Sequence, residues 1–252
     1  MQNIKLIIAY DGTAYLGWQK ANIGPSIEAT LQAIIEKILQ HPIILQAASR
    51  TDAGVHSEGQ VVNFLTTKID FDLNKFQNSL NRLLPKDIIV LHVEDMPLSF
   101  HPTLHCIGKE YRYFVCMGQS QLPYHRFYSW HVPYRLQIDT IHEACPYLIG
   151  SHDFSAFCNA KIKTHYSDYM REVQLLQLIE LDNNRLCFRI QGNHFLYKMV
   201  RNLVGTLIYI GRGKIPLQKL IEILESRDRP KAGITAPAHG LFLQRVIYEN
   251  CE

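Results

Sequence analysis

The segment REVQLLQLIELDNNRLCFRIQG, residues 171–192, constrains the fold more than any other part of the sequence. Two runs rich in apolar residues flank Asn183–Asn184. An Asn pair between two such runs is typical of the tight turn that joins neighbouring antiparallel strands. The segment therefore predicts an antiparallel β-hairpin in the C-terminal half of the chain.

Strand and helix patterns alternate along the first hundred residues. The run PSIEATLQAIIEKILQ carries apolar residues at helical spacing, and Ser26 is placed to cap that helix. A second helix through Phe76 and Leu80 is expected to stop before Pro85. The expected strands are Lys5–Tyr10, Ile43–Ala47, Gln60–Thr66 and Ile88–Glu94. This pattern predicts one unit of mixed strands and helices.

The periodicity lapses around SFHPTLHC, where Pro102 interrupts the chain. We therefore expect an N-terminal domain over residues 1–104 and a C-terminal domain over residues 105–252. Pro146 should kink or shorten the helix predicted around it, because proline lacks a backbone N–H. The other expected elements of the second domain are a strand at EYRYFVCM, a helix at FLYKMVRNLVGTLIYIG with Gly211 as its C-cap, a helix at Leu217–Glu225 and a strand at Leu243–Tyr248.

Composition places the chain among ordinary globular proteins. It has 252 residues, of which 47% are hydrophobic, and a formal net charge of +3. This mildly basic balance permits a polyanionic partner without requiring one. No apolar run is long enough to span a membrane, and the first one meets Asp11–Gly12 too soon for a signal peptide. We therefore expect a cytoplasmic protein.

The sequence offers little support for a bound cofactor. Its six cysteines show no close spacing of the kind that zinc sites or redox motifs need, so reduced, buried thiols are expected. Its twelve histidines form no His-Glu-x-x-His pattern. The glycines of GRGK, residues 211–214, lack the rest of a nucleotide-binding fingerprint. We expect no metal and no cofactor.

The segment SRTDAGVH, residues 49–56, concentrates polar chemistry in a short glycine-containing loop. It contains Arg50, Asp52 and His56 just before an apolar run. One explanation is ordinary turn chemistry, since Asp bonds to nearby amides and Gly accepts a positive φ. The other is a catalytic carboxylate with basic partners. The loop alone does not decide between them.

Three further segments combine basic and aromatic residues. In GKEYRYF, strand alternation places Tyr111 and Tyr113 on one face, as core residues or as a stacking platform beside Lys109 for an unstacked base. In FLYKMVRNLVG, Lys198 and Arg201 form a solvated stripe, or Arg201 turns inward and needs a carboxylate. The segment RDRPKAG, residues 227–233, is most simply an exposed basic loop and secondarily a phosphate contact.

The segment SRTDAGVH closely resembles the motif of the TruA family of tRNA pseudouridine synthases. Five more blocks resemble that family, in the family's order and across nearly the whole chain. They are YDGTAYLGWQ, KEYRYF, HDFSAF, FLYKMVRNLVG and APAHGLFL. The resemblance implies an α+β fold of two α/β subdomains, the pseudouridine synthase fold, with a largely antiparallel central sheet flanked by helices.

The resemblance also implies a reaction and its residues. Uridine would be isomerised to pseudouridine without metal or cofactor, with Asp52 attacking the nucleoside or removing a ribose proton. Arg201 would keep Asp52 ionised, and Tyr111 would stack on the extruded uracil. The remaining implied RNA contacts and pocket wall are Arg50, Lys109, Lys198 and Leu241.

The family precedent implies tRNA as the partner, at positions 38, 39 and 40 of the anticodon stem-loop, and a homodimer whose subunits share one tRNA. We expect His56 to be mainly structural, fixing the loop by a hydrogen bond. Two alternatives stay open at this point. One is a tRNA-binding or tRNA-folding module without catalysis, and the other is a hydrolase that uses Asp52 and His56 as an acid–base pair.

Overall fold

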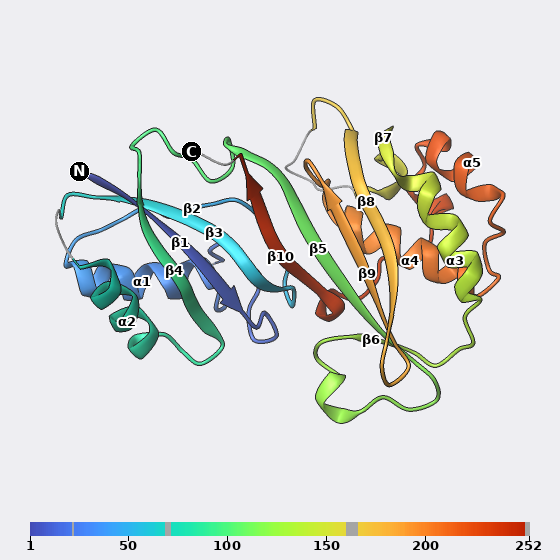
Figure 1. Ribbon diagram of the computed structural model, residues 1–252, viewed down its shortest axis with the longest axis horizontal. Coiled ribbons are helices and arrows are strands. Elements are labelled where there is room, and N and C mark those ends of the chain that lie inside the picture. The colour runs from blue at the N-terminus through green and yellow to red at the C-terminus, as the bar shows by residue number, and fades with distance from the viewer. Residues whose placement is uncertain (22, 69–71, 160–165, 250–252) are drawn as a thin grey trace. The chain divides into compact units, whose positions relative to one another are not determined.

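The computed structural model describes residues 1–21, 23–68, 72–159 and 166–249 (Figure 1). The chain divides into two compact units. The first unit contains Met1–Ile107 together with the segment from Phe242 onward, and the second is Gly108–Leu241. The change of unit at 107 and 108 lies close to the expected boundary at 104 and 105, whereas the C-terminal strand, expected in the second domain, clusters with the first unit.

A sheet in the order β4–β1–β3–β10, with β2 added on β3, forms the first unit. β1 pairs antiparallel with β3 and β4, while β10 runs parallel to β3 with Phe242 opposite His56. Because parallel strands need a long connection, the C-terminal strand can join this sheet after the intervening residues 108–241. The strands are β1 (Gln2–Tyr10), β2 (Gln46–Ala47), β3 (His56–Thr66), β4 (Ile88–Met96) and β10 (Leu241–Tyr248).

Two helices supply the rest of this unit's core, α1 (Ile27–Leu39) and α2 (Leu73–Leu83). Ser26 caps α1 as predicted, since its side chain accepts a 3.3 Å hydrogen bond from the amide of Ala29. The buried side chains of α1 share one face and join the strand residues of the same core cluster. Burying each such Leu or Ile stabilises the fold by about 1.5–3 kcal/mol.

The strands of the second unit follow the order β5–β9–β8–β7 in the ten-stranded sheet, with β6 parallel to β5. The other pairings among these strands are antiparallel. One face of these strands is apolar, because cross-strand partners on it are buried together. They are Tyr111, Tyr113 and Val115 of β5, Leu176 and Leu178 of β8, and Leu186, Phe188 and Ile190 of β9. The strands are β5 (Cys106–Met117), β6 (Trp130–Val132), β7 (Gly150–Asp153), β8 (Met170–Leu181) and β9 (Arg185–Gly192).

The predicted hairpin is confirmed as β8 and β9. Asn183 and Asn184 both have positive φ, at 61° and 55°. Two consecutive residues with positive φ are the signature of the turn that matches the twist of paired strands. The pairing places Leu181 opposite Arg185 immediately beside the turn.

Helices α3 (Ile138–Ala144), α4 (Met199–Gly211) and α5 (Lys219–Ser226) belong to the second unit. Gly211 is the last residue of α4, and Arg212, not Gly211, is the C-cap. The expected role of Gly211 is therefore wrong, and close packing explains the glycine. A Cβ on Gly211 would lie 2.5 Å from Cδ1 of Ile141, so a side chain there would require the Ile141 side chain to move.

The effect predicted for Pro146 is confirmed. α3 ends at Ala144, and the chain continues as the short 3₁₀ turn η2 (Cys145–Leu148), with Pro146 in its first residues. Proline is tolerated there because the first amides of a helix have no intrahelical acceptor. Four more 3₁₀ turns are described, η1 (Pro123–His125), η3 (Ser155–Phe157), η4 (Arg229–Lys231) and η5 (Ala238–Gly240).

The α+β class with largely antiparallel sheets flanked by helices is confirmed. The lengths of two strands differ from expectation. β2 contains only Gln46–Ala47 of the expected Ile43–Ala47, and β3 begins at His56 instead of Gln60. An irregularity between Ile8 and Tyr10 in the β1–β3 register lets the pairing continue to Ser57, which explains the longer β3.

In the described part of the chain, no helix combines the length and apolar character needed to cross a bilayer. Five cysteines are described, and all are buried free thiols, as expected. They are Cys106, Cys116, Cys145, Cys158 and Cys187. Cys251 lies outside the described residues.

Candidate active site

Asp52 opens a tight turn between β2 and β3. The amide of Val55 donates a 3.1 Å hydrogen bond to the backbone carbonyl of Asp52. Gly54 has a φ of 75°, which glycine adopts without strain. The side chain of Asp52 is partly exposed and that of Arg50 is exposed. The backbone thus follows ordinary turn chemistry, and it presents the carboxylate at a fixed point.

The segment between β1 and α1 holds the residues on either side of Asp52. The amide of Trp18 donates to the carbonyl of Thr51 at 3.0 Å, and the hydroxyls of Tyr10 and Thr51 lie 2.8 Å apart. Gly17, with a φ of 94°, approaches so closely that a Cβ there would lie 2.6 Å from the carbonyl oxygen of Thr51. The YDGTAYLGWQ block therefore acts as the support of the Asp52 turn. Sequence reasoning missed this role, and the two glycines of the block were the available signal.

His56 is buried where β3 begins. Its Nδ1 lies 3.1 Å from the amide of Gly12 and 3.1 Å from a carboxylate oxygen of Asp11. Nδ1 accepts from the amide when it carries no proton and donates to Asp11 when it carries one, so only one of these two contacts forms at a time. The ring also stacks on Phe242 with centroids 4.5 Å apart. These contacts are consistent with the structural role that we expected for His56.

Tyr111 and Lys109 lie on the helix-bearing face of β5. Tyr111 pairs with Ile190 and is 7% exposed, and Lys109 pairs with Gly192 and is 9% exposed. The ring of Phe195 meets that of Tyr111 edge-on, with centroids 5.2 Å apart. The alternation predicted for GKEYRYF is therefore correct, because Arg112 pairs with Arg189 on the opposite face.

On that opposite face, an ion pair ties β5 to β9. Glu110 is 1% exposed and accepts two hydrogen bonds from Arg189, at 2.9 and 3.0 Å. This bidentate contact raises the pKa of the Arg189 guanidinium. Because side chains alternate along a strand, fixing Glu110 on one face also fixes the direction of its neighbour Tyr111 on the other.

Arg201 lies in the first turn of α4 and is half-buried. Its Nε donates a 2.7 Å hydrogen bond to the carbonyl of Ala236, whose amide donates back to the carbonyl of Arg201 at 3.1 Å. The Tyr113 hydroxyl donates to the next carbonyl, Pro237, at 2.7 Å. Burial raises the pKa of Tyr113 well above its usual value, although the nearby Arg201 charge opposes this shift. The Arg201 side chain thus points inward, which was one of the two predictions made for it.

Lys198 immediately precedes α4 in a left-handed conformation, with a φ of 60°. Its ammonium group lies 5.0 Å from the ring centroid of Tyr197, within the range of a cation–π contact. Leu241 follows η5 and is 6% exposed. The neighbouring Gly240 packs so tightly that a Cβ would lie 2.7 Å from the ring of Tyr113.

A buried amide connects two of the family-like blocks inside the second unit. Asn202 of α4 is fully buried and donates to the carbonyl of Phe157 at 2.7 Å and to Oδ1 of Asn159 at 2.8 Å. Its own Oδ1 accepts from Arg229 at 2.8 Å and from Thr235 at 2.7 Å. Sequence reasoning missed Asn202, although a polar residue on so apolar a helix was a usable signal.

The same network corrects the expectation for RDRPKAG. Arg229 is half-buried and also donates to Asn159 at 3.2 Å and to the carbonyl of Gly233 at 2.7 Å. Burial lowers the pKa of its guanidinium. Arg227 pairs with Asp153 at 3.0 Å. Arg229 is therefore a structural brace under α4, whereas Arg227 is 70% exposed, as expected of a surface loop.

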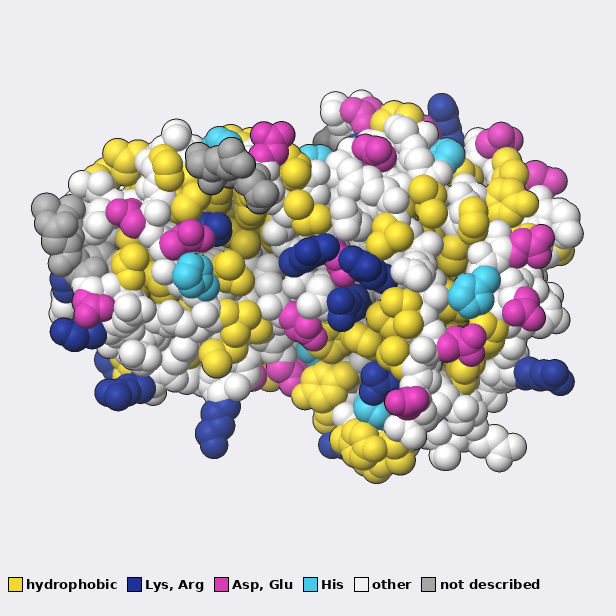
Figure 2. Space-filling view, viewed as in Figure 1, with side chains coloured by type: hydrophobic (Ala, Val, Ile, Leu, Met, Phe, Trp, Pro, Cys, Tyr) yellow, Lys and Arg dark blue, Asp and Glu magenta, His cyan; other side chains and the backbone are white. Residues whose placement is uncertain are grey.

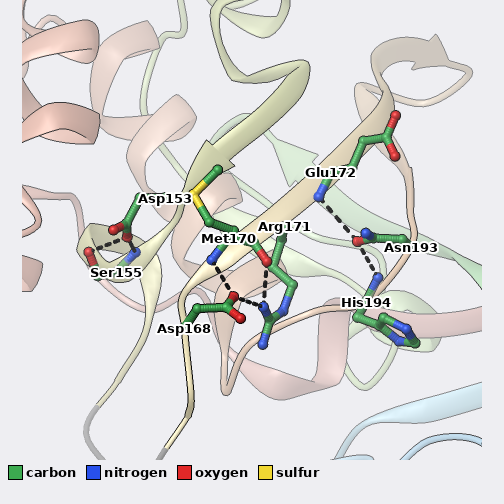
Figure 3. A network of polar contacts seen from close by, with 8 residues as sticks. All are labelled: Asp153, Ser155, Asp168, Met170, Arg171, Glu172, Asn193 and His194. Atoms are coloured by element: carbon green, nitrogen blue, oxygen red, sulfur yellow. Dashed lines mark hydrogen bonds and ion pairs between the residues drawn. The ribbon is translucent and has the colours of Figure 1, made fainter.

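A chain of polar contacts organises the strand ends that lead into α4 (Figure 3). Oδ1 of Asn193 accepts from the amides of Glu172 and His194, at 3.1 and 2.6 Å. Asp168 accepts from the amide of Met170 at 2.9 Å and from Arg171 at 3.1 Å. These bonds fix the turn after β9, which carries Phe195 to Tyr111 and the chain on to Lys198.

The expected site residues thus fall into two groups. Arg50 and Asp52 lie together on the loop of the first unit. The others belong to the second unit, on β5, at the start of α4 and just after η5. They are Lys109, Tyr111, Lys198, Arg201 and Leu241. The pairing of Asp52 with Arg201 stays a prediction. Within residues 1–21, 23–68, 72–159 and 166–249, no group of three or more His, Cys, Asp or Glu side chains is placed to hold a metal ion.

Comparisons with known proteins match the parts of the chain that contain most of the family-like blocks. The family model described as tRNA pseudouridine synthase matches residues 6–103 and 144–249. The tRNA pseudouridine synthase A 2 of Protochlamydia amoebophila (strain UWE25) is 61% identical over 248 residues, covering 98% of this chain and 95% of the relative. The tRNA pseudouridine synthase A of Thermoanaerobacter sp. (strain X514) is 43% identical, covering 98% of this chain and 100% of the relative. That of Exiguobacterium sp. (strain ATCC BAA-1283 / AT1b) is 40% identical with full coverage of both chains.

The matches extend over nearly the whole length of the relatives, and they include the block that carries Asp52 as well as the blocks that meet at Asn202. The two alternatives left open by the sequence, a noncatalytic RNA-binding module and a hydrolase, are not supported, because these relatives are named as synthases. The chain therefore belongs to the TruA family of tRNA pseudouridine synthases, and it is an isomerase that acts on uridine in tRNA.

Proposed function

We propose that Asp52 is the catalytic group of this isomerase and that its target is a uridine at position 38, 39 or 40 of the tRNA anticodon stem-loop. The observation that carries the proposal is the turn that presents Asp52. The amide of Trp18 donates a 3.0 Å hydrogen bond to the carbonyl of Thr51, and Gly17 packs closely against the same turn. The backbone that carries the Asp52 carboxylate is therefore fixed in position. Preorganisation of this kind is what a reacting side chain needs.

In the proposed reaction, the N1–C1′ bond of uridine breaks, the uracil rotates, and a bond forms between C5 and C1′. The proton on C5 is then lost to solvent, and N1 gains a proton. Asp52 either attacks the nucleoside or removes a ribose proton, and both routes start from the ionised carboxylate. Either route is isomerisation, so no external oxidant, reductant or phosphate donor enters the balance.

Tyr111 is the proposed stacking surface for the extruded uracil. A base that reacts must leave the helical stack, and an aromatic ring offsets part of that cost. The edge-on contact with Phe195 at 5.2 Å supports a ring of fixed orientation. Its hydroxyl is also a proposed participant in the removal of the C5 proton. Tyr111→Phe separates the two roles, because it keeps the ring and deletes the hydroxyl, whereas Tyr111→Ala loses both.

Arg201 is the proposed ionic partner of Asp52. The half-buried position of Arg201, on a helix whose other residues are almost all buried, supports an inward guanidinium. A cation near a carboxylate lowers its pKa and keeps it ionised. In this proposal the first unit carries the catalytic loop, and the second completes the active site.

The proposed RNA contacts follow from charge. Arg50 is exposed two residues before Asp52, where it contacts a phosphate or fills the space that the extruded base leaves. Lys109 and Lys198 flank the Tyr111 and Arg201 positions and would bind the RNA backbone. Leu241 would form an apolar wall of the base pocket.

We also propose a homodimer that shares one tRNA, and a cytoplasmic location, where its substrate is processed. A sedimentation experiment at micromolar protein concentration tests the first statement. A monomer with full activity on tRNA would contradict it.

The experiment that tests the catalytic proposal measures tritium release from C5 of uracil-labelled tRNA. Asp52→Asn should abolish turnover and leave tRNA affinity within a few-fold, because affinity comes mainly from phosphate neutralisation and stacking. Substantial residual turnover would exclude Asp52 as the catalyst. Replacing the uridines at positions 38, 39 and 40 by cytidine should remove the wild-type signal, and full release from such a tRNA would exclude the proposed target.

A further inference from the structure

The segment QLPYHRFYSWHVPYR, residues 121–135, is here called the aromatic loop. It follows β5 and contains η1 and β6. It has five aromatic residues, two arginines and two histidines, and neither Asp nor Glu. Aromatic side chains without neighbouring acids are the composition with which proteins bind unpaired nucleotides.

Four of the five aromatic side chains of this loop are exposed in the folded chain. Tyr124 is 63% exposed, Phe127 43%, Tyr128 38% and Tyr134 53%. Figure 2 shows hydrophobic side chains gathered at the loop that Figure 1 places after β5, with Lys or Arg, His and Asp or Glu side chains next to them. So many large aromatic side chains in one short surface segment mark an interaction site.

The shape of the loop is set by hydrogen bonds before any partner binds. Ser129 Oγ donates to the carbonyl of His125 at 3.0 Å, and Gln121 donates to the carbonyl of Ser129 at 3.0 Å. Arg126 donates to the carbonyl of Pro123 at 2.7 Å, and His131 Nε2 lies 2.8 Å from the carbonyl of Gly118. A surface that is already ordered loses little conformational entropy when a base stacks on it.

Cations accompany the aromatic rings. The guanidinium of Arg126 lies 4.2 Å from the ring centroid of Phe127, and that of Arg212 lies 3.7 Å from that of Tyr134. Arg185 lies 3.2 Å from Nε2 of His125. Burial and the Arg185 charge lower the pKa of His125, so this ring is neutral near pH 7 and the arginines carry the positive charge.

We propose that the aromatic loop binds unpaired nucleotides of the RNA substrate, with bases stacked on Tyr124 and Phe127 and a phosphate held by Arg126. The proposal rests on the function proposed above only in taking tRNA as the substrate. Tyr111 and Met117 are six residues apart on β5, which is about 20 Å along a strand. The loop therefore contacts nucleotides other than the uridine that reacts.

Charge favours RNA over a second copy of the chain as the occupant. If the loop lay on the axis of a twofold interface, the arginines of one acid-free loop would face those of the other. Removing like charges from water without a counter-charge is unfavourable. A phosphodiester supplies the missing negative charge, and nucleobases supply flat surfaces for the rings.

The test compares tRNA affinity by fluorescence anisotropy in wild type, Tyr124→Ala and Phe127→Ala. Loss of one stacked base should weaken binding about tenfold in each variant. Phe127→Tyr keeps the ring and should bind like wild type. Tyr147→Ala is the matched control, since Tyr147 is 44% exposed in the same unit but outside the loop, and it should also bind like wild type.

Two further measurements separate this proposal from the catalytic one. At saturating enzyme, the single-turnover rate of tritium release should be the same in Tyr124→Ala and wild type, because the loop does not touch the reacting uridine. Arg126→Ala should reduce the slope of log affinity against log salt by about 0.7–0.9, the share of one phosphate contact.

Three outcomes would overturn the proposal. The first is tRNA affinity within twofold of wild type in both alanine variants. The second is a salt slope in Arg126→Ala that equals the wild-type slope. The third is dissociation of a dimer by Tyr124→Ala with unchanged RNA affinity per protomer, which would assign the loop to contact with a second copy.

Discussion

The support of the Asp52 turn by Gly17 gives the sharpest test of the site. Gly17 has a φ of 94°, and a Cβ there would lie 2.6 Å from the carbonyl oxygen of Thr51 and 3.0 Å from the amide nitrogen of Ala53. Those two atoms belong to the residues on either side of Asp52. Gly17→Ala should therefore displace the proposed catalytic carboxylate without changing any group that is proposed to touch the substrate.

The size of the displacement follows from the contact distances. An ordinary contact begins at 3.4 Å, so the 2.6 Å approach requires a movement of 3.4 − 2.6, or about 0.8 Å. A misplacement of about 1 Å can reduce the rate of an enzyme on the order of 100-fold. The strained backbone adds a loss of about 1–3 kcal/mol in the free energy of unfolding. Gly17→Ala should thus lose both stability and turnover.

Gly213→Ala is the matched control. Gly213 has a φ of 69° but nothing within 4 Å of the position that a Cβ would take. It should lose a similar amount of stability to backbone strain and keep its turnover. The assay is single-turnover tritium release from tRNA at a temperature where thermal melts show both variants folded. A Gly17→Ala rate within twofold of that of Gly213→Ala would refute the inference that Gly17 positions Asp52.

Three more predictions concern the second unit. Arg201→Ala should lower both the melting temperature and the turnover rate, and Arg201→Lys should recover part of each. Because Arg201 also bonds to Ala236, its pairing with Asp52 is tested by a double-mutant cycle with Asp52→Asn. A coupling below about 0.5 kcal/mol in the free energy of unfolding would contradict the Asp52–Arg201 pair. Asn202→Leu should destabilise the fold by about 2–3 kcal/mol in urea unfolding, since it leaves the partners of a buried amide unsatisfied, and an unchanged midpoint would be contrary evidence. Burial would raise the pKa of Asp153, but hydrogen bonds from Ser155 and the Arg227 charge hold it below its usual 3.8. The stability that this carboxylate contributes is present above pH 3.8 and is lost as the pH falls through the lower folded-state pKa. Asp153→Asn should therefore make the free energy of unfolding less dependent on pH in the acid range. An unchanged pH dependence would argue against this linkage.

Most strands and helices were predictable from the sequence because local signals set them. Ser26 bonds to its own helix, and Asn183–Asn184 make a turn that needs no distant partner. Pro146 acts on the residues next to it. The type of element and one of its ends can be inferred wherever the determining contact lies within a few residues.

The roles that the sequence did not reveal depend on contacts between distant segments. Gly17 is explained by Thr51, and Gly211 by Ile141. Arg229 was taken for a surface residue because the buried oxygen that it meets belongs to Asn202, in another helix. Periodicity describes each segment alone, so it cannot show which segment supplies the partner of a polar group.

The two units support their proposed site residues by different physical means, and this difference predicts how each responds to substitution. Around Asp52 the support comes from backbone amides and close glycine approaches, so an added methyl group is the damaging change. Under α4 it comes from a buried side-chain amide shared with Arg229, so removal of a polar group is the damaging change. Loss of the buried Asn202 amide leaves Arg229 and Thr235 short of one acceptor, which costs more than a displaced loop at the surface. Substitutions in the first unit should therefore reduce turnover before stability, whereas those around Asn202 should reduce stability first.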